Sequence, residues 1–212
     1  MQNKKTTNLV LLALFAAIIF ILAFTPIGYL QLGVIKATII HIPVIVGSIL
    51  LGPKKGAVLG FLFGLTSLIS NTFTPVLMSF AFSPLIPVFG TDKGSPMALF
   101  ICFLPRIMVG IVPYYVYQLL DKLFHSKWKI LTFTVSGILG SLTNTLLVMN
   151  GIYFIFKDSY AAARSIPLET VYSAVLAIIF GNGIPEAIVA GIVTSALCKA
   201  LMSNKQIRDM IS

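Results

Sequence analysis

Long apolar stretches alternate along the chain with short clusters of lysine, glycine and proline. A helix needs about 20 mostly apolar residues to cross the hydrocarbon core of a bilayer, so each long uncharged stretch predicts one membrane-spanning helix. Six spans are expected, over residues 8–24, 38–51, 56–71, 96–120, 130–154 and 167–202. Pro105, Pro113 and Pro185 lie inside the fourth and sixth spans and predict kinks or tilts there. The pattern is that of an all-α polytopic membrane protein with both termini on one side.

The composition agrees with this pattern and excludes a water-soluble domain. Of the 212 residues, 58% are hydrophobic and 10% are charged. Soluble domains contain roughly 45–50% apolar and about 25% charged residues. No repeat, low-complexity tract or polar linker divides the chain. We therefore expect a single integral membrane domain over residues 1–212, in contact with membrane lipid.

The net charge of +9 sets the orientation of the predicted helices. The basic residues of the chain stand at the ends of apolar runs and form no stripe on a polar helix. This arrangement argues against a nucleic-acid partner. Ten of them fall on the side of the termini, which the positive-inside rule makes cytoplasmic: Lys4, Lys5, Lys54, Lys55, Lys122, Lys127, Lys129, Lys199, Lys205 and Arg208. The other five lie outside or within the membrane: Lys36, Lys93, Arg106, Lys157 and Arg164.

The predicted outer loop over residues 72–95 is unusually apolar for a solvated segment, and its prolines argue against a regular helix. Irregular backbone at membrane depth persists only where it is buried in protein or lines a cavity. Two interpretations remain open. The loop either packs over helix ends or forms a lid over an outward-facing pocket.

Polar side chains inside spans are costly, so each one is a candidate for a binding site. His41, Asn71, Arg106, Asn144 and Asn182 can converge in the outer half of the membrane. Arg106 is the strongest candidate, because its planar guanidinium suits a ligand carboxylate. The alternative is a structural ion pair with Glu186 on the last helix.

The remaining candidates each have a structural alternative. Glu186 follows Asn182 by four residues, which predicts that both lie on one helix face and line the pocket. Asn144 would bind a ligand amide or bridge two helices, and His41 would contact the ligand or make one interface hydrogen bond. Cys102 and Cys198 lie in apolar stretches without paired spacing, so neither a disulfide nor a metal site is expected.

Small residues recur at four-residue spacing on three predicted helices, which permits close helix contact. Gly56, Gly60 and Gly64 on the third, and Ala187 and Gly191 on the sixth, are expected to pack within the bundle. Ala13 and Ala17 on the first helix would instead form a docking surface for another membrane protein.

The sequence contains no GxxxxGK[ST], HExxH or GxSxG motif and no cluster of acidic residues. The chain is therefore expected to hydrolyse no ATP itself, to be no enzyme and to need no cofactor or metal. A membrane-embedded enzyme acting on a lipid is disfavoured for the same reason. A stand-alone small-solute permease is the more serious alternative, although no inverted repeat with broken helices is visible.

Several motifs together resemble the substrate-binding S component of an energy-coupling factor (ECF) transporter. They are the Ala13 and Ala17 pair, Ile40-His41-Ile42-Pro43, residues 51–57, Leu104-Pro105-Arg106 and Thr143-Asn144-Thr145. The resemblance implies a multi-pass subunit of a prokaryotic cell membrane that binds a vitamin from outside, with its first and third outer loops as lids. It also implies docking on a transmembrane coupling protein that is driven by two cytoplasmic ATPases.

Within that family the chain is most similar to the pantothenate-type members. This likeness rests on residues 24–28, on residues 40–43 and on residues 182–186. Pantothenate is a small amide with hydroxyls and one carboxylate, so one arginine and several amide side chains suit it. Folate, riboflavin and a pyrimidine precursor remain alternative ligands.

Overall fold

The computed structural model describes residues 4–32, 35–124 and 127–203, and the side chains of residues 29–37 lie outside this description. Helices dominate, and their bounds follow in chain order. They are α1 (Lys4–Phe24), η1 (Pro26–Gly28), α2 (His41–Leu51), α3 (Pro53–Phe73), η2 (Ser79–Ala81), α4 (Met97–Val109), α5 (Val112–Leu123), α6 (Lys129–Arg164), η3 (Leu168–Thr170), α7 (Val171–Ile178), the π-helix η4 (Ile179–Gly183) and α8 (Ile184–Ser203). A hairpin of β1 (Tyr29–Leu32) and β2 (Ile35–Thr38) lies between α1 and α2.

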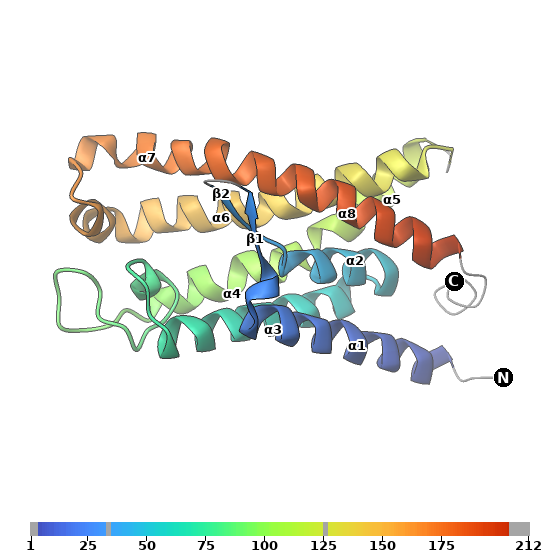
Figure 1. Ribbon diagram of the computed structural model, residues 1–212, viewed down its shortest axis with the longest axis horizontal. Coiled ribbons are helices and arrows are strands. Elements are labelled where there is room, and N and C mark those ends of the chain that lie inside the picture. Colours follow the sequence, from blue (N-terminus) through green and yellow to red (C-terminus); the bar gives the residue numbers. More distant parts are fainter. Residues whose placement is uncertain (1–3, 33–34, 125–126, 204–212) are drawn as a thin grey trace.

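The helices form one elongated bundle (Figure 1). The start of α1 and the end of α8 lie at the same end of the bundle, which we call the terminal end. The α3–α4 connection and the turn between α6 and α7 lie at the opposite end, which we call the loop end. The prediction that α1 starts and α8 ends on one side is therefore confirmed for the described residues.

Five helical segments are long and apolar enough to cross a bilayer, and the second predicted span is a short helix. The helix α2 has 11 residues, a length of about 17 Å. It starts at His41 because Thr38, where the span was predicted to begin, belongs to β2. Every residue of α2 from His41 to Leu50 is buried. This short helix therefore runs inside the bundle, away from lipid.

The fourth and fifth predicted spans differ from the structure in their boundaries. The fourth is divided at Gly110 and Ile111 into α4 and α5, with Pro113 at the start of α5, where its missing N–H is tolerated. The fifth continues beyond residue 154, because α6 extends to Arg164 with a kink at Phe156. The 36 residues of α6 give a length of about 54 Å, so this helix projects well beyond a hydrocarbon core about 30 Å thick.

The last predicted span consists of α7, η4 and α8 in succession. The π-helix η4 ends two residues before Pro185. Proline has no backbone N–H to donate to the preceding turn, and π-helical turns accompany local bends in helices. The distortion expected near Pro185 is therefore present as a widened turn.

The hairpin was not predicted from the sequence. Its strands pair antiparallel, with Tyr29 opposite Thr38. In Figure 1 the hairpin crosses the bundle from the end of α1 towards α7 and α8. The backbone N–H of Thr38 donates a 2.7 Å hydrogen bond to Oε1 of Glu186, which fastens β2 to α8.

Two hydrophobic clusters hold the bundle together. The first surrounds α2 and includes Phe15, Ile19, Val44 and Phe133. The second lies among α4, α6, α7 and η2, where the rings of Phe80 and Phe156 meet edge to face at 5.7 Å. The first holds α1 and α8 around α2, and the second holds the α3–α4 connection against the helices.

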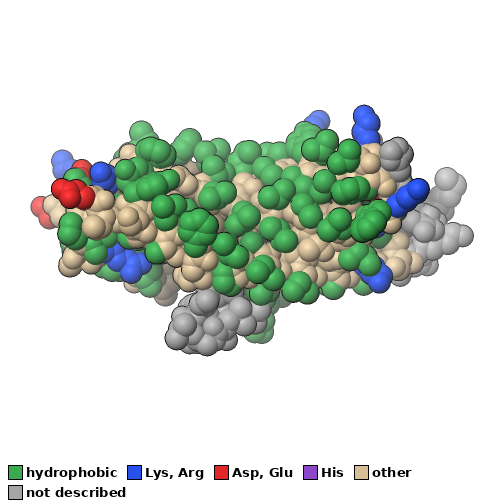
Figure 2. Space-filling model, turned by 90° about the horizontal axis from the view of Figure 1, so that it is seen from above, with side chains coloured by type: hydrophobic (Ala, Val, Ile, Leu, Met, Phe, Trp, Pro, Cys, Tyr) green, Lys and Arg blue, Asp and Glu red, His purple; other side chains and the backbone are tan. Residues whose placement is uncertain are grey.

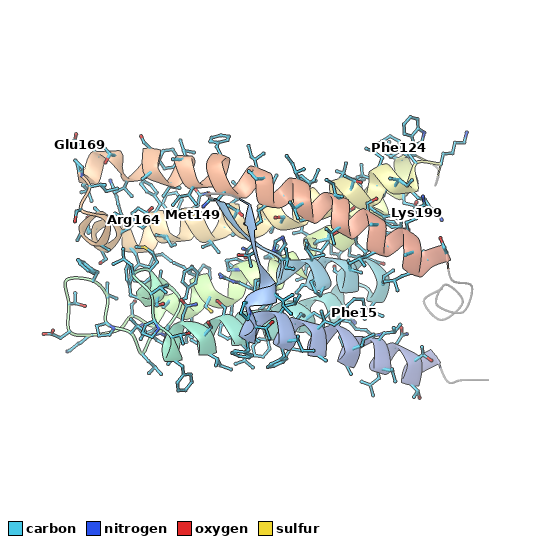
Figure 3. The ribbon with its side chains drawn as sticks, viewed as in Figure 1. Phe15, Phe124, Met149, Arg164, Glu169 and Lys199 are labelled. Carbon is cyan, nitrogen blue, oxygen red and sulfur yellow. The ribbon has the colours of Figure 1, made fainter. Side chains whose placement is uncertain are left out.

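Hydrophobic side chains cover the middle of the bundle and charged side chains gather at its two ends (Figure 2). Lys199 lies at the terminal end, whereas Arg164 and Glu169 lie at the loop end (Figure 3). Lys205 and Arg208, which were predicted for the terminal side, lie outside the described residues. The apolar middle is the surface of an integral membrane protein.

The predicted packing roles of the small residues on α3 and α8 agree with the structure. A Cβ atom on Gly60 would collide with the carbonyl oxygen of Arg106 on α4. Gly191 packs against Ile138 of α6, and Ala187 is buried. The α3 glycines therefore let the backbone of α4 come unusually close.

Candidate functional site

A cavity of about 210 Å³ lies between the hairpin, the start of α2 and the helices α3, α4, α6 and α8. Its walls are mostly polar. The lining residues are Ala23, Thr38, Ile40, Phe63, Thr66, Ser67, Ser70, Asn71, Arg106, Asn144 and Glu186.

Arg106 reaches this cavity from α4 and is 7% exposed. Its Nη1 donates a 2.9 Å hydrogen bond to the carbonyl oxygen of Ile101, and its Nη2 donates a 3.5 Å hydrogen bond to Oγ of Ser67. The guanidinium carbon lies 5.6 Å from the ring centre of Phe63 and 4.9 Å from that of Phe82. These contacts hold the guanidinium in place while its Nε has no hydrogen-bond partner.

Asn144 lines the same cavity from α6. Its Oδ1 is buried and has no hydrogen-bond partner. Buried polar atoms in proteins are almost always paired. Arg106 and Asn144, which both line this cavity, therefore each keep hydrogen-bonding capacity that the protein does not use.

Glu186 lines the cavity from the first turn of α8. Its carboxylate accepts the Thr38 N–H, while the guanidinium of Arg106 bonds to Ile101 and Ser67. No ion pair links Arg106 to Glu186, both of which the structure describes. The structural pair that was the alternative interpretation of Arg106 is therefore not formed, and both side chains line the cavity separately.

Asn71 fastens the α3–α4 connection to the edge of the cavity. Its Nδ2 donates to the carbonyl oxygen of Ser67 at 2.8 Å, and its Oδ1 accepts a 2.7 Å hydrogen bond from Oγ of Ser79 in η2. A further 2.7 Å hydrogen bond joins Thr72 to Ser83. The connection is thus folded over the helix ends, and Phe82 brings it into contact with Arg106.

Two of the six predicted ligand-binding residues lie outside the cavity lining. His41 is 2% exposed at the start of α2, next to the lining residue Ile40, and its Nε2 has no hydrogen-bond partner. Asn182 is exposed on η4. The expectation that Asn182 shares a face with Glu186 assumed regular α-helical spacing, and the π-helical turn between them breaks that spacing.

The hydroxyl-bearing wall of the cavity was missed in the sequence. Thr66, Ser67 and Ser70 line the cavity from α3, beside Asn71, which was predicted. Their spacing of one, three and four residues places them on one helix face, and this signal was readable from the sequence. Phe82 carried no comparable signal, because it reaches Arg106 through the fold of the α3–α4 connection.

The predicted docking residues Ala13 and Ala17 are both exposed on α1. They lie apart from the cavity lining. Within the described residues, no group of three or more metal-ligating side chains comes together.

Comparisons with known proteins identify relatives of this chain. The family model described as "ECF transporter, substrate-specific component" matches residues 7–198. The chain is 37% identical over 203 residues to the pantothenic acid transporter PanT of Lactococcus lactis subsp. cremoris, covering 95% of this chain and 96% of that relative. It is 29% identical over 212 residues to the pantothenate transporter PanT of Leuconostoc mesenteroides subsp. mesenteroides, covering 95% of each.

A solved structure has the same fold. The crystal structure of the S component for biotin from an ECF-type ABC transporter superposes with a TM-score of 0.58 at 18% identity, covering 100% of this chain and 99% of that chain. The family match spans most of the chain, and the fold likeness spans all of it. The chain belongs to the family of substrate-specific components of ECF transporters.

Proposed function

We propose that this chain captures pantothenate from outside the cell for uptake by an ECF importer. One observation carries the proposal. Arg106 and Asn144 line one small cavity, and each side chain has a hydrogen-bonding atom without a partner. A ligand that satisfies both needs an anionic acceptor and an N–H or O–H donor, and pantothenate carries a carboxylate, an amide and two hydroxyls.

The other walls of the cavity suit the same ligand. Glu186 accepts one hydrogen bond from Thr38, and a carboxylate has about four lone-pair sites, so acceptor capacity remains for ligand hydroxyls. The hydroxyls of Thr66, Ser67 and Ser70 add further partners. Phe63 is the aromatic residue of the lining, which offers little stacking for a fused ring system.

The size of the cavity favours a small vitamin. Its volume of about 210 Å³ lies below the range of roughly 300–1,000 Å³ that is typical of sites for drug-sized ligands. Riboflavin and folate are larger and carry fused aromatic rings. The names of the Lactococcus and Leuconostoc relatives point to the same ligand.

Calorimetry on the purified chain, without ATP or an ion gradient, tests the proposal. We expect pantothenate to bind with one site per chain, and riboflavin, folate, thiamine and pyrimidine precursors to bind far more weakly. The reason is that pantothenate is small and brings one carboxylate for Arg106 together with an amide and hydroxyls for Asn144, Glu186 and the hydroxyl side chains. Binding of an uncharged vitamin in place of pantothenate would overturn the assignment of Arg106 to a carboxylate.

We further propose that the terminal end faces the cytoplasm and that the chain delivers its ligand to a coupling protein with two ATPases. The lysines near the terminal end support this orientation through the positive-inside rule. Ala13 and Ala17 support a docked partner, because their small side chains are exposed on one face of α1. A partner helix approaches such a face closely.

Replacing both Ala13 and Ala17 by Leu should abolish ATP-dependent pantothenate uptake in vesicles that also contain the coupling protein and ATPases. Added bulk blocks close helix approach, while the ligand cavity lies elsewhere. Uptake assays and calorimetry on the same variant provide the measurement. Ala13→Ser with Ala17→Ser is the matched control, because it changes the same two positions, keeps their side chains small and should leave uptake intact.

A stand-alone permease predicts a different result. Vesicles that contain this chain alone would then take up pantothenate without ATP. Unchanged ATP-dependent uptake by the Ala13→Leu and Ala17→Leu double variant would contradict the docking role of α1.

A further inference from the structure

A second and larger hollow opens at the terminal end of the bundle, away from the ligand cavity. It is a groove of about 560 Å³ between the ends of α1, α2, α5, α6 and α8. We call it the terminal groove. Its lining residues are Asn8, Ile49, Leu50, Leu51, Gly52, Tyr114, Tyr117, Gln118, Lys129, Ile130, Phe133, Lys199, Met202 and Ser203.

One side of the terminal groove is apolar. The last turn of α2 contributes Ile49, Leu50 and Leu51, and α8 contributes Met202. The ring of Phe133 is stacked on that of Tyr117, with centres 5.4 Å apart and planes inclined by 7°. Leu51 and Met202 are only partly buried, so they offer apolar surface to the groove.

The other side of the terminal groove is basic. Lys129 and Lys199 line it, both are exposed, and no acidic residue is among its lining residues. The nearest acid in sequence is Asp121, one turn beyond Tyr117 on α5 and outside the lining. Figure 3 shows Lys199 near the end of α8, at the margin of the bundle.

The start of α6 adds to this positive potential. Lys129 is the first residue of α6, no acidic residue occupies its first turn, and Trp128 makes no capping hydrogen bond from its side chain. The first backbone N–H groups of a helix lack partners within the helix, so they favour an anion. Here they stand beside two lysines.

We propose that the terminal groove binds an anionic phospholipid, with the phosphate between Lys129 and Lys199 and an acyl chain along the apolar wall. Basic pockets between membrane helices bind anionic headgroups in this way. A zwitterionic lipid fits less well, because its own ammonium group is repelled by the two lysines. A free phosphate would use the basic side of the groove and leave the apolar wall unfilled.

The only tryptophan of the chain, Trp128, stands next to Lys129 and reports on this groove. The purified chain is reconstituted into phosphatidylcholine vesicles that contain a minor fraction of brominated phosphatidylglycerol, brominated phosphatidylethanolamine or brominated phosphatidylcholine. Bromine quenches tryptophan fluorescence at short range. We expect a preference of roughly 30-fold for phosphatidylglycerol over phosphatidylcholine. This is the combined electrostatic effect expected of two lysines near one anionic lipid.

Two matched variants decide whether the lysines of the groove cause this preference. Lys129→Gln with Lys199→Gln should remove it, and Lys54→Gln with Lys55→Gln should keep it. The control removes the same charge from the start of α3, which contributes no residue to the groove. Melting temperatures of both variants should equal that of the unaltered chain, because all four substitutions leave buried contacts untouched.

Three results would overturn the proposal. Equal quenching by brominated phosphatidylglycerol and brominated phosphatidylcholine excludes a site for an anionic lipid. Equal loss of the phosphatidylglycerol preference in the two double variants would mean that the basic end as a whole attracts the lipid, without a site in the groove. Release of the lipid by millimolar inorganic phosphate means a phosphate site without use of the apolar wall. The inference depends only on the membrane location of the chain, so its failure would leave the proposed vitamin binding untouched.

Discussion

The cavity around Arg106 and the terminal groove hold positive charge in different environments. The cavity holds one guanidinium that is 7% exposed, hydrogen-bonded to Ile101 and Ser67 and flanked by two rings. The groove holds two lysines that are exposed, beside an apolar wall and in a volume more than twice as large. A fixed, dehydrated charge recognises the geometry of its partner, whereas exposed charges attract anions in general and are weakened by salt.

This difference predicts how each region responds to substitution. Removing the buried charge of Arg106 should lower binding affinity strongly, and only for the ligand of the cavity. Removing the exposed charges of Lys129 and Lys199 should have a smaller effect on affinity and should reduce the preference for anionic lipid.

Arg106→Ala should weaken pantothenate binding by roughly 30-fold or more, because truncating a buried charged partner costs about 2–5 kcal/mol. Arg106→Lys should restore little, since an ammonium lacks the planar fork. Calorimetry measures both. The matched control is Arg164→Ala, which removes an exposed arginine at the loop end and should leave affinity unchanged. Equal effects of the two alanine variants would mean that the cavity attracts the vitamin only through general charge.

Gly60→Ala should lower both the melting temperature and the affinity for pantothenate. The new methyl group would collide with the carbonyl oxygen of Arg106 and push α4 away from α3. Such overpacking costs roughly 1–3 kcal/mol. Thermal unfolding and calorimetry on one preparation give both values.

Gly181→Ala is the control for Gly60→Ala. A Cβ atom at Gly181 meets nothing within 4 Å, so stability and affinity should remain as in the unaltered chain. Full affinity of the Gly60→Ala variant would show that the guanidinium tolerates a shift of its backbone.

Glu186→Gln should weaken pantothenate binding by a few-fold only. Glutamine keeps an oxygen that accepts the Thr38 N–H, but a neutral acceptor contributes about 1 kcal/mol less than a charged one. Affinity measured by calorimetry should fall without a large change in melting temperature. Glu169→Gln, an exposed carboxylate at the loop end, serves as control and should have no effect. Tighter binding by Glu186→Gln would show that the carboxylate repels the ligand.

The sequence predicted the helices well because membrane spans depend on a single strong signal, the length of apolar stretches. It also predicted the packing of Gly60, since close helix contact leaves a four-residue pattern of small residues. The hairpin left no such signal, because its eight residues lie between two apolar helices and their pairing is a matter of backbone. The start of α2 at His41 was also not predicted, because the pairing of Thr38 in β2 left no pattern in the sequence.

Residues of the candidate site were predicted correctly where their chemistry stands out in the sequence. They were missed or misplaced where their position depends on helical register or on the folding of a loop. Arg106 was identified because a charged residue inside a span is rare. Asn182 was assigned to the cavity by counting α-helical turns, and the π-helix at residues 179–183 changes that count. Phe82 and Thr38 contact cavity residues only after loops and strands have folded back.

The short, buried helix α2 has a consequence for permeability. It begins beside Ile40 in the wall of the ligand cavity and ends at Ile49 to Leu51 in the wall of the terminal groove. Ile49 follows Ile40 by nine residues, a rise of about 14 Å along the helix, and the helix residues between them are buried. In this conformation the packed side chains of α2 lie between the cavity and the terminal end. A solute could therefore pass from the cavity to the terminal groove along α2 only after this packing changes.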